Sequence, residues 1–203
     1  MKNPMKKKLF LSLTILTFGL LGPGAQAEKA EGKALRIHLL SGSGEYKSAI
    51  SLPKRAKLLE KDGHTCTIAS GVKKKEDFAN LKNCDVLVVF SKRWKLKDEA
   101  LEAVQTAATT KPVIGIRTAT HAFTGGGSFG GKISYGAFGP LVMGEGWGSH
   151  HGGHKRQGAR GVIEKANAKH PILHGVKDVF GPSDVYGIRK VTPERDPKII
   201  KNR

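Results

Sequence analysis

The sequence predicts an α/β protein with a doubly wound, mostly parallel sheet, and two observations carry this prediction. Short apolar runs alternate with segments of helical periodicity through the first part of the chain, which is the pattern of β–α–β units. The segment "DVLVVF" at 85–90 is apolar after its first residue, as expected for a strand buried on both faces of a parallel sheet. The chain length of 203 residues fits one domain with one hydrophobic core.

The first strand, loop and helix each have a local signal. "ALRIHLL" at 34–40 alternates its apolar residues and predicts a strand, which ends in the small-residue loop "SGSGEYKS" at 41–48. A helix is expected next, with Ser51 as its N-cap, Pro53 in its first turn and Gly63 just beyond its end.

The elements that follow continue the alternation. "HTCTIAS" at 64–70 predicts the second strand, and a charged link leads to the third strand at 85–90. "KDEALEAVQTAA" at 97–108 has acidic residues at its start and an apolar stripe, so it predicts a helix. "PVIGI" at 112–116 is the fourth strand expected.

The pattern is less regular after Phe123. A glycine-rich segment at 124–140 precedes "GEGWGSHHGGHK" at 144–155, which we interpret as a loop. Strands are expected at 159–165 ("ARGVIEK") and 184–191 ("DVYGIRKV"). The chain stops at "KIIKNR" without an obvious closing element, so a further C-terminal segment could be missing from a core of about 34–190.

The first 27 residues are expected to be a signal peptide. A basic start precedes an apolar run from Leu9 to Leu21, and "AQA" at 25–27 matches a small-x-small cleavage site. The apolar run is shorter than the roughly 18 residues that indicate a membrane span, and an uncleaved anchor is the alternative. We therefore expect an exported protein, periplasmic or extracellular, with residues 28–203 as a single domain and no transmembrane anchor after cleavage.

The net charge of the chain indicates which kinds of surface it could bind, and its two cysteines raise the question of a disulfide. The formal net charge is +18, which favours association with anionic surfaces such as acidic polysaccharides, although a merely solvated basic surface is the alternative. Few aromatic residues lie among the lysines, so no stacking platform and no nucleic-acid partner are expected. Export would allow a disulfide between Cys66 and Cys84, but two unpaired thiols facing the core explain them equally well.

Two residues stand where parallel sheets bind their ligands. Ligands of such sheets lie beyond the carboxyl ends of the strands, so the loops at 41–48, 91–95 and 117–121 are expected to meet there. Arg117 and His121 begin and end the last of these loops. The alternative is structural: an arginine that closes a strand with a salt bridge, and a histidine that fills a helix cap.

The segment "SHHGGH" gathers His150, His151 and His154. The two glycines between them would let the backbone bend and bring the imidazoles around a divalent metal or a polar ligand. If a metal is bound, His151 and His154 are its candidate ligands. The spacing matches no helical zinc signature, and a polar loop with coincidental histidines is the alternative.

"GGSFGGKI" at 126–133 nearly matches a phosphate-binding loop, but Ile133 replaces the required hydroxyl and no strand directly precedes it, so we reject that function.

"PVIGIRTATHAF" at 112–123 resembles the strand and elbow of class I glutamine amidotransferases, whose pattern is P-x-x-G-I-C-x-G-x-Q. Arg117 occupies the position of the cysteine nucleophile, so glutamine amidotransferase activity is not expected. The chain as a whole resembles the ThuA-like (trehalose-utilisation) family, which shares that fold and lacks the cysteine. The resemblance rests on the order of "LLSGSGEYKSA", "DVLVVFSKR", "KPVIGIRTATHAF", "GWGSHHGGHK", "RGVIEKANAKHPIL" and "VFGPSDVYGIR".

The resemblance implies a flavodoxin-like domain that acts on carbohydrate, with trehalose-like or oxidised (3-keto) glycosides as substrates, in a lyase or hydrolase reaction. A small carbohydrate or glycan is the partner expected, and homo-oligomers are compatible with it. The candidate catalytic residues are Arg117, His121, His151 and His154. The candidate ligand-binding residues are Ser43, Glu45, Tyr46, Trp147, His150, Asp184 and Tyr186.

A mechanism follows for a keto glycoside. A neutral histidine, either His121 or one of His151 and His154, would remove the proton next to the ketone, and Arg117 would hold the enediolate that forms. If the histidines hold a metal, the metal would polarise the ketone and Arg117 would orient the sugar. The alternatives are a non-catalytic glycan-binding domain and a basic envelope protein that binds acidic polymers.

Overall fold

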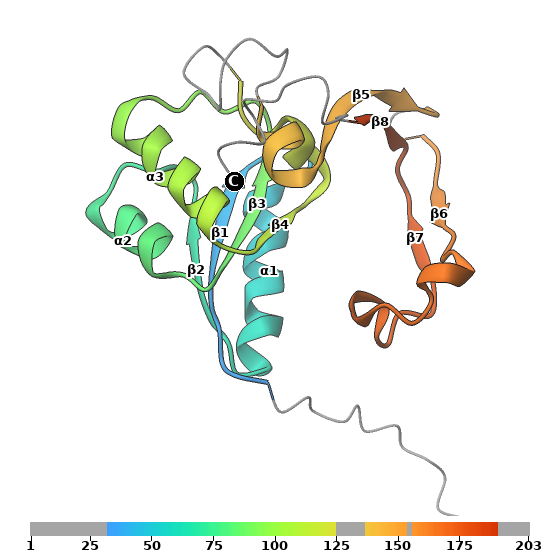
Figure 1. The fold of residues 1–203 in the computed structure, drawn as a ribbon, viewed down its shortest axis with the longest axis horizontal. Helices are drawn as coiled ribbons and strands as arrows, with labels where there is room; N and C mark the ends of the chain where they lie inside the picture. Colours follow the sequence, from blue (N-terminus) through green and yellow to red (C-terminus); the bar gives the residue numbers. More distant parts are fainter. Residues whose placement is uncertain (1–31, 125–136, 154–155, 191–203) are drawn as a thin grey trace, which may run out of the picture. The chain divides into compact units, whose positions relative to one another are not determined.

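The computed structural model describes residues 32–124, 137–153 and 156–190 (Figure 1). The expected signal peptide, most of the glycine-rich segment and His154 lie outside these residues.

A parallel sheet of four strands forms the centre of the domain, in the order β2-β1-β3-β4. The strands are β1 (Arg36–Gly42), β2 (Thr65–Ala69), β3 (Val86–Ser91) and β4 (Val113–Gly115). This is the strand order of flavodoxin-like sheets, in which the order reverses between β1 and β3 and ligands bind at that switch point. The predicted flavodoxin-like α/β fold class is therefore confirmed.

Three helices cover the two faces of this sheet. Helix α1 (Ser48–Lys61) packs through Leu52 and Ala56 on one face, whereas α2 (Lys75–Asn83) and α3 (Asp98–Thr110) cover the other (Figure 1). Each face has its own buried apolar cluster, because side chains alternate between the two sides along every strand.

Two helix predictions were wrong in detail. Helix α1 begins at Ser48 rather than after Ser51, and Pro53 lies inside it. The Ser48 hydroxyl accepts a hydrogen bond from the Ser43 backbone N–H at 2.9 Å, so the glycine-containing loop is tied directly to the start of the helix. The charged link is in fact α2, whose start is stabilised by the Asp77 carboxylate, which accepts from the backbone N–H groups of Lys73 and Lys74.

The remaining strands form two small antiparallel ladders. Strand β5 (Glu145–His151) pairs with β8 (Val185–Lys190), and β6 (Ala159–Gly161) pairs with β7 (Val179–Gly181). The expected loop at 144–155 is thus a strand as far as His151. The segment at 159–165 is strand only in its first part. The other short elements are 3₁₀ turns at Arg117–His121, Lys165–Asn167 and Pro171–Leu173, and a π-helical turn at Gly139–Met143.

Cys66 is half-buried, Cys84 is buried, and both thiols are free. Within the described ranges, the helices are too short or too polar to cross a membrane.

Gly139 provides a test of the packing between the loop after β4 and the start of β5. A Cβ atom at this position would lie 2.2 Å from the Thr120 carbonyl oxygen and 2.7 Å from that of Glu145. We predict that Gly139→Ala lowers the free energy of unfolding by about 1–3 kcal/mol, because backbone atoms must move to admit the methyl group. Urea unfolding measures this. The matched variant Gly181→Ala, where no heavy atom lies within 4 Å of the added Cβ, should change it by less than about 0.5 kcal/mol. Equal effects of the two substitutions would contradict this packing.

Candidate functional site

The loops that follow β1, β3 and β4 meet at the carboxyl edge of the sheet. The Lys92 ammonium group forms an ion pair with the Glu45 carboxylate and so joins the loops on the two sides of the switch point. The backbone N–H of Arg93 donates to the His121 carbonyl oxygen at 3.0 Å. Tyr46, in the first loop, accepts from the Arg117 guanidinium at 3.1 Å. The structure therefore brings together the loops that the strand pattern placed at this edge.

Arg117 forms a sharp elbow between β4 and the 3₁₀ turn. Its φ of 50° lies in the left-handed region, which is unfavourable for a residue with a Cβ atom, and strain of this kind is enriched at functional sites. The neighbouring Thr118 fixes the turn, since its hydroxyl donates to the Ser91 carbonyl oxygen at 2.6 Å. Nucleophilic serines are presented on a comparable strained strand-to-helix turn in α/β hydrolases. Here the elbow presents a guanidinium group.

The guanidinium of Arg117 is bound mainly by the protein itself. Its Nη2 donates to Asp184 Oδ1 at 2.6 Å and to Ser183 Oγ at 3.1 Å, and Nη1 donates to the Asp184 carbonyl oxygen at 2.7 Å. The guanidinium carbon lies 4.1 Å from the centre of the Tyr186 ring and 4.9 Å from that of Tyr46, within the range of cation–π attraction. These contacts engage both Nη atoms and direct them at Asp184 and its neighbours, whereas Nε is buried and has no hydrogen-bond partner among the described residues.

Asp184 connects Arg117 to a histidine. Its side chain is fully buried, and its second carboxylate oxygen, Oδ2, lies 2.5 Å from His150 Nδ1. Burial alone would raise the pKa of Asp184, but hydrogen bonds from His150, Ser183 and Arg117 hold it well below its usual range. The carboxylate is therefore ionised and can orient the imidazole. With Nδ1–H donating to it, Nε2 becomes the nitrogen that can accept a proton. The His150 side chain is 42% exposed, so a ligand can reach it.

His121 has a different environment. It is buried, and its ring lies 5.4 Å, centre to centre, from both Trp147 and Tyr186. Burial, reinforced by the positive charges of Arg93 and Lys92, lowers the pKa of His121 to about 4. It is therefore neutral at pH 7. Burial disfavours the charged form of Tyr186 as well, and because that form is the phenolate, the pKa of Tyr186 is raised and the side chain stays protonated.

A β-bulge decides which residues of β5 face this cluster. Pairing with β8 shifts between Trp147 and Ser149, and this irregularity places Trp147 and His150 on the same side of the strand. Both rings contact Tyr186, at 6.4 and 5.2 Å between centres. His151, the next residue, is exposed and makes none of the aromatic or carboxylate contacts of its neighbour.

The remaining candidates are less directly placed. Ser43 is fully buried beneath the loop after β1, and its hydroxyl has no hydrogen-bond partner among the described residues. His154 lies outside them. Within the described ranges, no group of three or more His, Cys, Asp or Glu side chains is placed to hold a metal ion.

Sequence reasoning missed Lys92, Arg93 and Ser183. The two basic residues could have been found, since their loop was already expected at the site.

The strand order defines a flavodoxin-like α/β domain, and an arginine stands at the elbow after β4. The structure matches the crystal structure of a protein from Bacteroides uniformis ATCC 8492 that is described as ThuA-like, with a TM-score of 0.55 and 14% sequence identity. The chain therefore has a ThuA-like fold. The match covers 81% of this chain and 66% of that one, just under two thirds of its length. No family model and no curated protein matches the sequence.

The buried histidines predict how stability depends on pH. His121 and His38 both have a pKa lowered to about 4 by burial, whereas a histidine in the unfolded chain titrates near 6.5. The unfolded chain thus binds more protons as the pH falls from about 6.5 towards 4, and the folded state loses stability over that window.

We predict that lowering the pH from 7 to 5 reduces the free energy of unfolding by roughly 1–2 kcal/mol for each of these histidines. His121→Gln and His38→Gln should each remove its own share of this loss, and the double variant most of it. Urea unfolding at the two pH values measures the effect. A double variant with the wild-type pH dependence would refute the assignment.

Proposed function

We propose that this site acts on a carbohydrate, with His150 as a general base oriented by Asp184, and that its substrates are 3-keto glycosides. The observation that carries the proposal is the contact between the exposed His150 ring and a buried, ionised carboxylate held by Arg117. A carboxylate–histidine pair of this kind fixes the tautomer of the imidazole and stabilises the imidazolium formed when the base accepts a proton.

The reaction begins with the proton on the carbon next to the ketone, which the carbonyl group acidifies. His150 Nε2 takes this proton, and the electron pair of the broken C–H bond forms the enediolate. Collapse of the enediolate breaks the glycosidic C–O bond, and the departing alkoxide takes the proton from the imidazolium. Arg93, close enough to His121 to lower the pKa of that imidazole, supplies positive charge that favours a developing oxyanion, whereas Lys92 is already paired with Glu45.

Aromatic residues supply the features of a sugar site. Trp147, Tyr46 and Tyr186 surround the histidines and the elbow, and their rings can pack against the C–H faces of a pyranose. His121, buried and neutral, offers a polar ring nitrogen without a charge. The ThuA-like fold supports a carbohydrate over other keto compounds, through the resemblance to the trehalose-utilisation family.

The roles differ from those expected from the sequence. His150 replaces His121 and His151 as the base, and Arg117 positions Asp184 instead of holding the enediolate. In this proposal the domain works outside the cytoplasm, after removal of the signal peptide expected at 1–27.

A non-catalytic glycan-binding domain is the second candidate, and the Arg117–Asp184 pair favours it. A guanidinium whose two Nη atoms are bound to a carboxylate and its neighbours rigidifies the site without contributing charge to a transition state. Turnover separates the two functions, because a binding domain leaves its sugar unchanged.

We predict that the mature domain releases nitrophenolate from 4-nitrophenyl 3-keto-β-glucoside, and that His150→Gln lowers kcat by about 10²–10⁴-fold, the usual contribution of a general base. Asp184→Asn should lower kcat as well, because the orienting charge is lost. The matched control is His151→Gln, one residue further along β5, which should retain activity. Nitrophenolate absorbance measures the rate, and circular dichroism shows whether each variant is folded. Wild-type activity in a folded His150→Gln variant would refute the role of His150, and binding without release would favour the second candidate.

A further inference from the structure

The proposed reaction needs a hydrogen-bond donor for the ketone oxygen. When His150 removes the proton next to the ketone, negative charge develops on that oxygen, and enzymes stabilise such a charge with donors that are already in place. The Nη atoms of Arg117 are directed at Asp184 and its neighbours, and Arg93 supplies charge from an exposed position. A donor with a fixed direction therefore has to come from another side chain.

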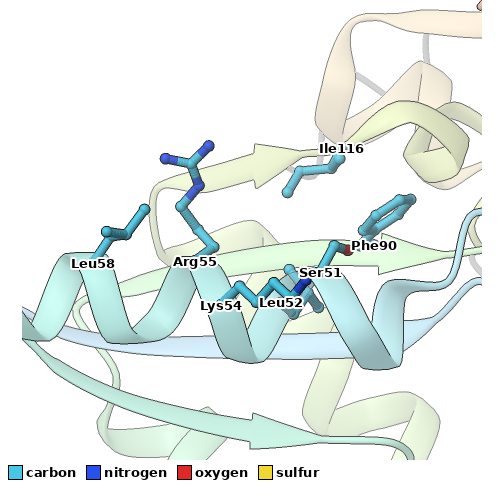
Figure 2. A pocket seen from close by; sticks show the side chains of 7 residues that line it. All are labelled: Ser51, Leu52, Lys54, Arg55, Leu58, Phe90 and Ile116. Atoms are coloured by element: carbon cyan, nitrogen blue, oxygen red, sulfur yellow. The ribbon is translucent and has the colours of Figure 1, made fainter. Parts of the chain in front are cut away.

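Tyr46 is held in place by packing and by its own loop. Its ring packs against the apolar cluster beneath α1, and two members of that cluster, Phe90 and Ile116, face the side chains of the helix (Figure 2). The backbone N–H of Lys47 donates to the Gly44 carbonyl oxygen at 3.1 Å, which closes a turn around Tyr46. The phenol thus has a defined position at the carboxyl edge of the sheet, just before α1 begins.

The hydroxyl oxygen of Tyr46 accepts two hydrogen bonds. One comes from Arg117 Nη2 at 3.1 Å, and the guanidinium carbon lies 4.9 Å from the centre of the Tyr46 ring. The other comes from Tyr186. Burial and, after it, the hydrogen bond with Tyr46 raise the pKa of Tyr186, which is the effect expected when the neutral Tyr186 phenol is the donor. The proton that Tyr46 itself donates is therefore directed away from both residues.

These contacts make Tyr46 a strong donor close to the proposed base. A hydrogen bond from a cation polarises the phenol that accepts it, and bonds in a chain strengthen one another. Ketosteroid isomerase uses a tyrosine hydroxyl in this way, in the oxyanion hole that holds its enolate. The Tyr186 ring lies 5.2 Å, centre to centre, from His150. Tyr186 is thus a shared neighbour of Tyr46 and His150, so a sugar bound beside it would be within reach of both.

We propose that the Tyr46 hydroxyl donates a hydrogen bond to the ketone oxygen of the substrate and stabilises the enediolate. This inference rests on the proposed function and adds a catalytic residue to it. Tyr46 keeps its proton throughout, while the proton removed from carbon goes to His150 Nε2. Arg117 is a positioning residue in this scheme, because it polarises Tyr46 without touching the substrate.

The test separates binding of an oxyanion from turnover. Ascorbate is a sugar-sized enediol lactone that is an anion at neutral pH, and methyl β-glucoside is the neutral control ligand. Isothermal titration calorimetry under nitrogen measures the affinity of the mature chain for each. We expect Tyr46→Phe to weaken ascorbate binding by about tenfold or more, which corresponds to about 1.4 kcal/mol, and glucoside binding by about twofold at most. Tyr186→Phe should weaken ascorbate binding less, because it removes only a bond onto Tyr46.

Kinetics with 4-nitrophenyl 3-keto-β-glucoside give a second readout. Tyr46→Phe should lower kcat by about 10²–10³-fold, the usual cost of removing one oxyanion-hole donor, with KM changed by about threefold at most. A purely structural role for Tyr46 would instead raise KM and weaken both ligands alike. Circular dichroism shows whether each variant is folded, and the phenylalanine ring preserves the packing against the cluster beneath α1.

Three results would overturn the role of Tyr46. They are a wild-type chain that does not bind ascorbate, a folded Tyr46→Phe variant that loses affinity for both ligands alike or for neither, and a larger loss of ascorbate binding in Tyr186→Phe, which would make Tyr186 the donor. Selective loss of ascorbate binding in Tyr46→Phe, together with no release of nitrophenolate by the wild type, would support Tyr46 as the oxyanion donor and refute the proposed catalysis. The two proposals therefore fail separately.

Discussion

The ion pair between Arg117 and Asp184 is the interaction on which the site depends. It joins the elbow after β4 to the start of β8 across 67 positions of sequence. The buried carboxylate has lost its hydration, and such a charge is tolerated only with good partners, because removing one of them leaves an uncompensated charge at a cost of several kcal/mol. Here Arg117, Ser183 and His150 all bind it. The pair therefore fixes β8, and through the ladder β5, against the carboxyl edge of the sheet.

The central sheet could be predicted because burial leaves a direct mark on the sequence. A strand covered on both faces, such as Val86–Ser91, has to be apolar throughout. Helix α2 was missed because it is short and contributes little more than Phe78 and Leu81 to the core, so its periodicity is weak. Strand β5 was taken for a loop because its glycines and histidines conceal the strand pattern. Its pairing depends on β8, which lies far away in the sequence.

The place of the site could also be predicted, but not the roles within it. The carboxyl ends of parallel strands meet at one edge whatever their residues, so Arg117, His121 and Tyr46 were expected there. The partner of an arginine is decided by tertiary packing, and local sequence does not show that Asp184 binds Arg117. The choice between His150 and His151 depends on a single bulge in β5, which reverses the side on which each residue lies.

The order of the elements along the chain has a consequence for biosynthesis. The strands of the central sheet end at Gly115, whereas Trp147, His150 and Asp184 all come later. A domain generally folds as one unit, and the apolar cluster beneath α2 and α3 also includes Ala137 and Phe138, so a nascent chain that ends at Gly115 lacks part of the core that supports its sheet. Core and site are therefore completed together late in synthesis, and a chain truncated before residue 184 holds neither the Arg117–Asp184 pair nor an oriented His150.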